Sequence, residues 1–228
     1  MSTITAICFN KDGSQVALCS GEKEIFIYNT NGSKDYSKWE KKHTLKEHTQ
    51  KAAVIDWNHE TGLILTGSYD RSIFVWKYAE EHKKYIPDFV NMDEKLAILD
   101  LKWNKQGNKF AVGTSSKRIF IGTYNEKLNW WTTSEIKKQF KSSVLSVEFS
   151  PNGKVIAAVS FDGTCKILSA CYAEISTDRE ESKTPFGEVT TFGDCLVKFH
   201  CQFWLNHVTW SPSGNSICYC SHDGTLNF

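Results

Sequence analysis

A histidine, a serine and an aspartate that together could perform hydrolysis lie close in the sequence: His48, Ser68 and Asp70. In a hydrolytic triad the serine hydroxyl attacks the substrate, the histidine removes its proton and the carboxylate orients the histidine. Such a site also requires an exposed nucleophile and hydrogen-bond donors for the oxyanion. The segment GSYDRSIFVW, residues 67–76, lacks the G-x-S-x-G turn that exposes a catalytic serine in many hydrolases. We therefore expect no catalytic residues here, and the three side chains require a structural explanation.

Five segments of the chain share one pattern of strand, turn and strand. An aromatic residue stands before each turn, at Phe9, Trp57, Trp103, Phe149 and Trp210. These markers are separated by 48, 46, 46 and 61 residues, and the first three steps approach the period of about 40–45 residues found in propeller repeats. A glycine follows four markers by four residues and Trp57 by five, as expected where a hairpin turn needs a positive φ. The chain is therefore predicted to consist of repeated β-units.

Further strands complete each unit. An acidic residue occurs thirteen positions after the marker in four copies, and a short run such as EIFIY, SIFVW or RIFIG follows. Alternation of apolar residues between turn residues is typical of half-buried antiparallel strands. The segments KWEKKHTL and WWTTSEI are candidate fourth strands. Four short strands per unit predict an all-β fold, a β-propeller.

The units resemble WD repeats, and this resemblance explains the three polar residues. In WD-repeat propellers a loop His, a second-strand Ser or Thr, a turn Asp and a third-strand Trp form one buried hydrogen-bond chain. His48, Ser68, Asp70 and Trp76 match these positions in order in the second unit. Each buried polar group would cost about 1–3 kcal/mol if it were left unpaired. The resemblance therefore implies a structural tetrad instead of a reaction centre.

A more specific resemblance runs along essentially the whole chain. The segments that carry it are LKEH (45–48), IDW (55–57), NKFAVGTSSKRI (108–119), NWW (129–131), IKK (136–138), SSVLSV (142–147), PFGE (185–188) and SHDGT (221–225). In order and spacing they resemble the WD-repeat subunit, subunit 1, of the actin-related protein 2/3 complex. In that family the propeller has seven blades.

The resemblance implies a non-catalytic scaffold subunit that supports nucleation of branched actin filaments through protein–protein contacts. The implied partners are the other subunits of the complex, the actin filament and nucleation-promoting factors. The implied location is cytoplasmic, at the actin cytoskeleton. The alternative is a WD-repeat adaptor of another multiprotein complex, for example in ubiquitin ligation or RNA processing. Copurification with actin-related proteins distinguishes the two.

We expect one β-propeller domain over residues 1–228, made of five of the seven blades, with the last blade incomplete. Seven blades of about 44 residues require about 300 residues, which exceeds the length of the chain. We expect an N-terminal portion of the propeller. The expected blades cover about 1–45, about 46–92, about 93–138, about 139–200 and, in part, about 201–228.

Composition and motifs argue against several other classes of function. The formal net charge of +1 gives no reason to expect nucleic acid as a partner. The sequence has no P-loop, no G-x-G-x-x-G and no Cys or His at metal-ligand spacing, so we expect no cofactor and no metal. It has no secretory signal pattern and no apolar run of 18 residues, so we expect no membrane association.

Residues outside the repeat pattern suggest an interaction surface. Residues 95–141 contain ten Lys and Arg but only three acidic residues. This basic stretch is either a solvated flank or a docking face for an acidic partner. The adjacent Trp130 and Trp131 point to opposite faces of a strand. They are either two aromatics wedged between blades 3 and 4, or an exposed contact residue beside a buried one. The candidate residues are Lys117, Arg118, Trp130, Trp131, Lys137 and Lys138.

Overall fold

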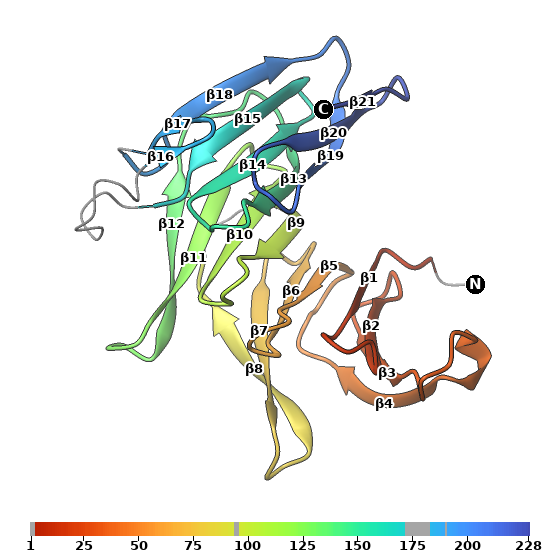
Figure 1. Cartoon of the computed structure of the whole chain (residues 1–228). Coiled ribbons are helices and arrows are strands. Elements are labelled where there is room, and N and C mark those ends of the chain that lie inside the picture. The colour runs from red at the N-terminus through yellow and green to blue at the C-terminus, as the bar shows by residue number, and fades with distance from the viewer. Residues whose placement is uncertain (1–2, 94–95, 172–182, 190) are drawn as a thin grey trace.

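The computed structural model describes residues 3–93, 96–171, 183–189 and 191–228, which form a series of antiparallel sheets (Figure 1). Each sheet contains strands that are consecutive in the chain or nearly so, as in a β-propeller. This architecture confirms the predicted all-β fold. We call the five sheets of three or four strands blades 1 to 5 in chain order.

Blades 1 to 3 are four-stranded sheets whose strand order follows the sequence. Blade 1 contains β1 (Ala6–Phe9), β2 (Gln15–Cys19), β3 (Ile25–Asn29) and β4 (Glu40–Leu45), with a short 3-10 helix, η1 (Tyr36–Lys38), before β4. Blade 2 contains β5 (Ala52–Trp57), β6 (Ile64–Ser68), β7 (Ile73–Ala79) and β8 (Lys84–Val90). Blade 3 contains β9 (Ile98–Trp103), β10 (Lys109–Thr114), β11 (Ile119–Asn125) and β12 (Trp130–Ile136).

Blade 4 takes its outer strand from beyond an insertion. It contains β13 (Val144–Phe149), β14 (Val155–Ser160), β15 (Thr164–Ser169) and β18 (Cys195–His200). The small hairpin of β16 (Lys183–Thr184) and β17 (Gly187–Glu188) precedes β18, and residues 172–182 lie outside the described part of the chain. Blade 5 contains β19 (Leu205–Trp210), β20 (Ile217–Ser221) and β21 (Leu226–Asn227).

The hydrophobic core is divided among the four boundaries between neighbouring blades. One cluster joins blades 1 and 2, and three more join blades 2 and 3, 3 and 4, and 4 and 5. Because successive residues of a strand point to opposite faces, Ile64 on β6 packs toward blade 1 and Leu65 packs toward blade 3. The middle strands are therefore buried on both faces, and each blade depends on its neighbours for its core.

The first strand of each blade lies beside the first strand of the next: β1 contacts β5, β5 contacts β9, β9 contacts β13 and β13 contacts β19. The turns and loops consequently lie at the two opposite ends of the strands. Within the described residues, no helix is long and apolar enough to cross a membrane.

Candidate interaction surface

A buried hydrogen-bond chain braces blade 2. The indole N–H of Trp76 donates to Thr66 Oγ1 at 2.9 Å, and His48 Nε2 lies 2.9 Å from the same oxygen. Since the indole can only donate, the Thr66 hydroxyl hydrogen is available to His48 Nε2, which places the imidazole hydrogen on Nδ1. That N–H faces Asp70 Oδ2 at 3.3 Å and Ser72 Oγ at 2.9 Å. The chain runs from the third strand to the loop before the blade.

Thr66 takes the place in this hydrogen-bond chain that the resemblance to WD repeats assigned to Ser68. The Ser68 hydroxyl donates to the carbonyl oxygen of Lys51 at 2.9 Å and accepts from the backbone N–H of Asp70 at 3.0 Å. Residues two apart on a strand share a face, so Thr66 and Ser68 both point toward the same side of β6. Thr66 is the one within reach of Trp76, and Ser68 closes the turn at the strand end.

The pKa shifts and burial of the residues in this hydrogen-bond chain indicate a structural role. Burial raises the pKa of Asp70, but hydrogen bonds from Ser72 and from the backbone N–H of Thr49, 2.7 Å away, outweigh it and hold the pKa at about 2. Burial lowers the pKa of His48, although Asp70 opposes this shift. Ser68 is fully buried, so its hydroxyl cannot reach a substrate. The arrangement therefore holds the loop against the blade and offers no exposed nucleophile.

A second set of hydrogen bonds crosses the blade boundaries, and the repeat pattern of the sequence does not predict it. Carboxylates on the first strands accept hydrogen bonds from backbone N–H groups of the next blade. Asp56 Oδ2 accepts from Trp103 at 2.8 Å, and Asp100 Oδ2 accepts from Val147 at 2.9 Å. Burial raises the pKa of Asp100, while the Val147 N–H and other partners lower it. These bonds couple the position of each blade to that of its neighbour.

The candidate basic residues of blade 3 lie at one end of the strands. Lys117 and Arg118 occupy the β10–β11 turn, and Lys137 and Lys138 follow β12. Arg118 is tied into the sheet, since its Nε and Nη2 donate to the two carboxylate oxygens of Glu135 at 2.9 and 2.8 Å. The three lysine side chains are exposed. The lysines, more than Arg118, are therefore available to a partner.

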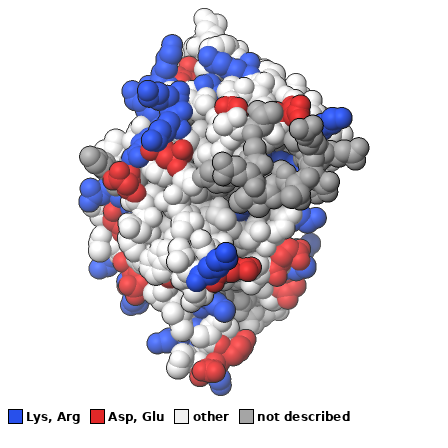
Figure 2. Space-filling model, turned by 90° about the vertical axis from the view of Figure 1, so that its left-hand side faces the viewer, with Lys and Arg blue, Asp and Glu red and all other residues white. Residues whose placement is uncertain are grey.

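Blade 4 adds basic residues that the sequence analysis did not single out. Lys166 on β15 is paired across the sheet with Lys198 on β18, which places two like charges opposite each other. Lys166 is only 8% exposed and donates through Nζ to the backbone carbonyl of Gln139, in the loop after β12. Figure 2 shows Lys and Arg side chains gathered on the upper part of one face of the molecule. We call the following exposed residues the basic surface: Lys137, Lys138, Lys141 and Lys198.

The two adjacent tryptophans have different environments. Trp131 is 4% exposed and packs on Trp103 and Phe110, with both pairs of ring centroids 5.3 Å apart. Trp130 is 42% exposed. Trp131 belongs to the cluster between blades 2 and 3, so the two aromatics do not wedge between blades 3 and 4. The reason is the register of β12, which turns Trp131 toward the face that blade 2 covers.

The six candidate residues do not form one continuous surface. Trp130 begins β12, opposite Asn125 on β11, and Lys137 follows the last residue of the same strand. At about 3.3 Å per residue, the two lie roughly 20 Å apart at opposite ends of blade 3. The structure therefore separates an aromatic position at one end from the basic surface at the other.

The described residues contain no group of three or more His, Cys, Asp or Glu side chains placed to hold a metal ion.

Lys102, within the predicted basic stretch, lies 3.6 Å from Asp56 and is half-buried among the first strands. Burial lowers its pKa, but Asp56 and Asp100 raise it further, so the side chain stays charged. Its charge is used inside the protein, and Lys95 lies outside the described residues.

Comparison with known proteins finds sequences similar to this chain. The family model of the WD domain, G-beta repeat, matches residues 39–77, 133–169 and 193–228. The actin-related protein 2/3 complex subunit 1A of Arabidopsis thaliana is 35% identical over 99% of this chain and 58% of its own length. Subunit 1A-B of Xenopus laevis is 32% identical over 100% of the chain and 60% of its own length. Subunit 1 of Saccharomyces cerevisiae is 29% identical over 96% of the chain and 56% of its own length.

Proposed function

We propose that this chain, which is a WD-repeat protein homologous to subunit 1 of the actin-related protein 2/3 complex, acts as a scaffold subunit of such a complex. The observation that carries the proposal is similarity along nearly the whole chain, at 35% identity over 99% of its residues. The chain spans about 58% of the length of this relative.

A non-catalytic role agrees with the chemistry of the blades. The hydrogen-bond chain that contains His48 and the carboxylates at the blade boundaries form their hydrogen bonds with backbone groups and neighbouring side chains. Groups committed in this way stabilise a rigid platform, because each would cost free energy if unpaired. We infer that the chain contributes shape and contacts to an assembly, and that nucleation of branched actin filaments is supported through those contacts.

The basic surface is our candidate for an acidic partner. Lys137 and Lys138 are exposed, and the like-charge pair of Lys166 and Lys198 is unfavourable for the chain alone. An acidic surface laid across these lysines would relieve that repulsion and speed association. The proposed partners are an actin filament, a nucleation-promoting factor or another subunit of the complex, at the cytoplasmic actin cytoskeleton.

Trp130 is our candidate for a separate subunit contact. Its side chain is exposed at the β11–β12 hairpin, and Leu128, two residues earlier in the same hairpin, is also exposed. Exposed aromatic residues are often the main energetic contributors to protein interfaces. Because this end of blade 3 lies away from the basic surface, a subunit could bind here while an acidic partner binds at the other end.

Coexpression with the remaining subunits of the complex tests the proposal. The chain should elute with the actin-related proteins on gel filtration, and the double variant Lys137→Glu, Lys138→Glu should reduce that recovery or the binding of an acidic activator. The matched control is Lys83→Glu, Lys84→Glu on the β7–β8 hairpin, two exposed lysines outside the basic surface. Elution of the unmodified chain apart from all other subunits would contradict a scaffold role.

A further inference from the structure

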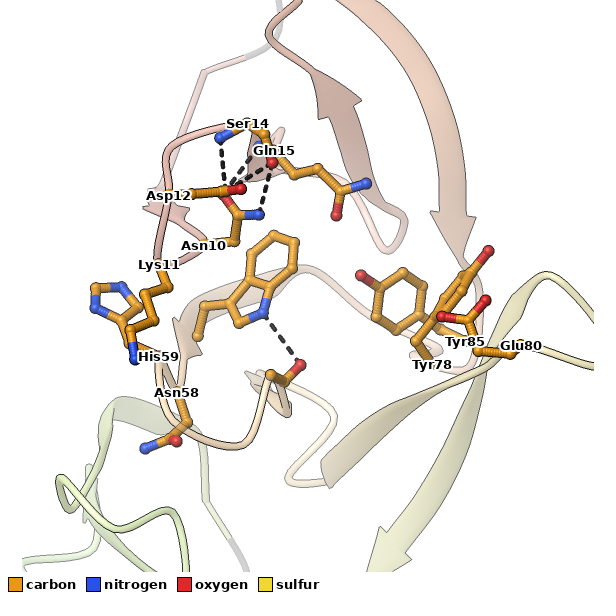
Figure 3. A pocket seen from close by; sticks show the side chains of 12 residues that line it. Asn10, Lys11, Asp12, Ser14, Gln15, Asn58, His59, Tyr78, Glu80 and Tyr85 are labelled. Carbon is orange, nitrogen blue, oxygen red and sulfur yellow. Dashed lines mark hydrogen bonds between the residues drawn. The ribbon is translucent and has the colours of Figure 1, made fainter. Parts of the chain in front are cut away.

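A cavity of about 570 Å³ opens between blades 1 and 2, at the end of the strands opposite the His48 chain (Figure 3). It is formed by the β1–β2 turn, the β5–β6 turn and the β7–β8 hairpin. Pockets of roughly 300–1,000 Å³ are the usual size for bound small molecules. The question is which chemical group its lining would accept.

Aromatic rings form one wall of the cavity. Tyr78 on β7 lies directly opposite Tyr85 on β8, and their ring centroids are 5.1 Å apart at an angle of 62°. Trp57 also lines the cavity, with its ring 6.4 Å from that of Tyr85 at 82°. His43 from β4 packs on both tyrosines, 5.5 Å from Tyr78 and 5.4 Å from Tyr85. The rings thus meet at several angles around one corner.

The ionisable groups in this corner leave it without positive charge. Burial, with help from Lys42, lowers the pKa of His43, so its ring is neutral at pH 7. Burial raises the pKa of Tyr85, whose hydroxyl stays protonated. A cation placed against these rings would meet their electron-rich faces and no competing positive group among them.

Negative charge stands beside the rings. Glu80 lines the cavity two residues after Tyr78, and among the described residues its carboxylate forms no ion pair. Asp12 lines the other rim, where Ser14 donates to it from its backbone N–H at 3.0 Å and from its hydroxyl at 2.7 Å. Hydrogen bonds from Ser14 keep the pKa of Asp12 low. The carboxylate of Asp12 is therefore charged at neutral pH.

The basic side chains of the lining contact groups other than the tyrosines. Lys11 Nζ pairs with the carboxylate of Glu60 at 3.3 Å, and His59 Nε2 lies 3.1 Å from the carbonyl oxygen of Phe9. Figure 3 shows Lys11 and His59 on one side of the pocket and Tyr78, Tyr85 and Glu80 together on the other. The tyrosine side of the cavity therefore combines aromatic faces with an available carboxylate.

We propose that this pocket receives an arginine side chain of a partner protein, with the guanidinium stacked on Tyr78 and Tyr85 and paired with Glu80. A guanidinium is planar, stays charged and stacks on aromatic rings, whereas a lysine ammonium is a compact and strongly hydrated charge. The pocket thus selects arginine over lysine and over neutral side chains of the same length. The inference goes beyond the scaffold role and does not depend on it.

Another cavity among the described residues does not share this chemistry. It measures about 440 Å³ between blades 2 and 3, and Lys77 and Asp88 both line it. Its aromatic lining residues are Tyr124 and Trp131. A lysine at the rim repels a cation, and the nearby Asp88 has a pKa raised by burial. Charge therefore favours the pocket between blades 1 and 2 as the arginine site.

The test is an NMR titration of the chain, labelled with nitrogen-15, with the peptide acetyl-Gly-Arg-Gly-amide. We expect saturable shifts of the Trp57 indole signal, identified with the Trp57→Phe variant, at millimolar peptide. The same peptide with citrulline, the neutral isostere of arginine, should cause no saturable shift, and the lysine peptide should bind more weakly. Glu80→Gln should weaken binding of the arginine peptide by about two- to fivefold.

Glu81→Gln is the matched control, because Glu81 is also exposed on the β7–β8 turn but does not line the cavity. Its affinity should equal that of the unmodified chain. Equal binding of the citrulline peptide, an unchanged affinity in Glu80→Gln, or the absence of any saturable shift would overturn the proposal. Equal binding of the lysine peptide would overturn the preference for arginine.

Discussion

The carboxylate of Glu148 on β13 accepts a hydrogen bond from the backbone N–H of Trp210 on β19, 2.9 Å away across the boundary between blades 4 and 5. The indole N–H of Trp210 returns to the same residue and donates to the backbone carbonyl of Glu148 at 3.0 Å. Asp56 and Asp100 make the corresponding backbone contacts at the two preceding boundaries. Adjacent blades are thus joined by specific hydrogen bonds as well as by apolar packing.

Glu148→Ala should lower the free energy of unfolding by about 1–3 kcal/mol, because the Trp210 N–H loses its acceptor at a half-buried site. Chemical denaturation followed by tryptophan fluorescence measures this loss. Glu126→Ala, in the exposed β11–β12 turn, is the control and should change stability by less than about 0.5 kcal/mol. Equal stability of the two variants would show that the bond does not join the blades.

Thr66→Val should destabilise the chain by about 1–3 kcal/mol. Valine keeps the shape of the side chain but removes the oxygen that lies between His48 and Trp76, leaving both ring nitrogens without that partner. Urea denaturation gives the magnitude, and the Trp76 indole signal in NMR should move at the same time. A valine variant as stable as the parent chain would mean that the hydrogen-bond chain does not brace the blade.

Asp70 and His48 should make stability fall as the pH is lowered. The pKa of Asp70 is about 2 in the folded chain, below its ordinary value of 3.8. Its contribution to the free energy of unfolding is therefore complete above pH 3.8 and is lost as the pH falls toward 2. The pKa of His48 is lowered by burial, so protonation of the unfolded chain below about pH 6.5 also favours unfolding. Both effects have the same sign.

The comparison of the parent chain with Asp70→Asn isolates the carboxylate. The difference between their unfolding free energies should be constant from pH 8 to about pH 5 and should shrink between about pH 5 and 2. A difference that grows as the pH falls would give Asp70 a pKa above its ordinary value and contradict the hydrogen-bonded geometry. Denaturant titrations at each pH supply the values.

Trp131→Ala and Trp130→Ala should differ sharply, although the residues are neighbours. Trp131 fills the space between blades 2 and 3, and its loss should cost about 3–5 kcal/mol. Trp130 is 42% exposed, and its loss should cost less than about 1 kcal/mol. Melting temperatures of the two variants check this. A similar loss in both would contradict the register of β12.

Periodic features of the structure were accessible from the sequence. The aromatic markers and turn glycines repeat, and the expected fourth strand WWTTSEI coincides with β12 (Trp130–Ile136). Backbone alternation also explains why one tryptophan of the pair is buried. These features depend on local spacing, which a single chain displays directly.

Features that depend on the pairing of distant segments were not accessible. Thr66 and Ser68 are both hydroxyl residues on one face of β6, and only the packed position of Trp76 selects Thr66. Lys166 and Lys198 become neighbours because β18 pairs with β15 across the insertion that follows β15. The tyrosine wall of the cavity likewise needs the β7–β8 register and the approach of blade 1.

The central claim is tested most directly by purifying the tagged chain from cytosol and identifying the bound proteins by mass spectrometry. The scaffold account predicts recovery of both actin-related proteins together with small subunits of the complex, in defined ratio to the chain. Recovery of a different assembly, for example a ubiquitin ligase, without actin-related proteins would contradict it.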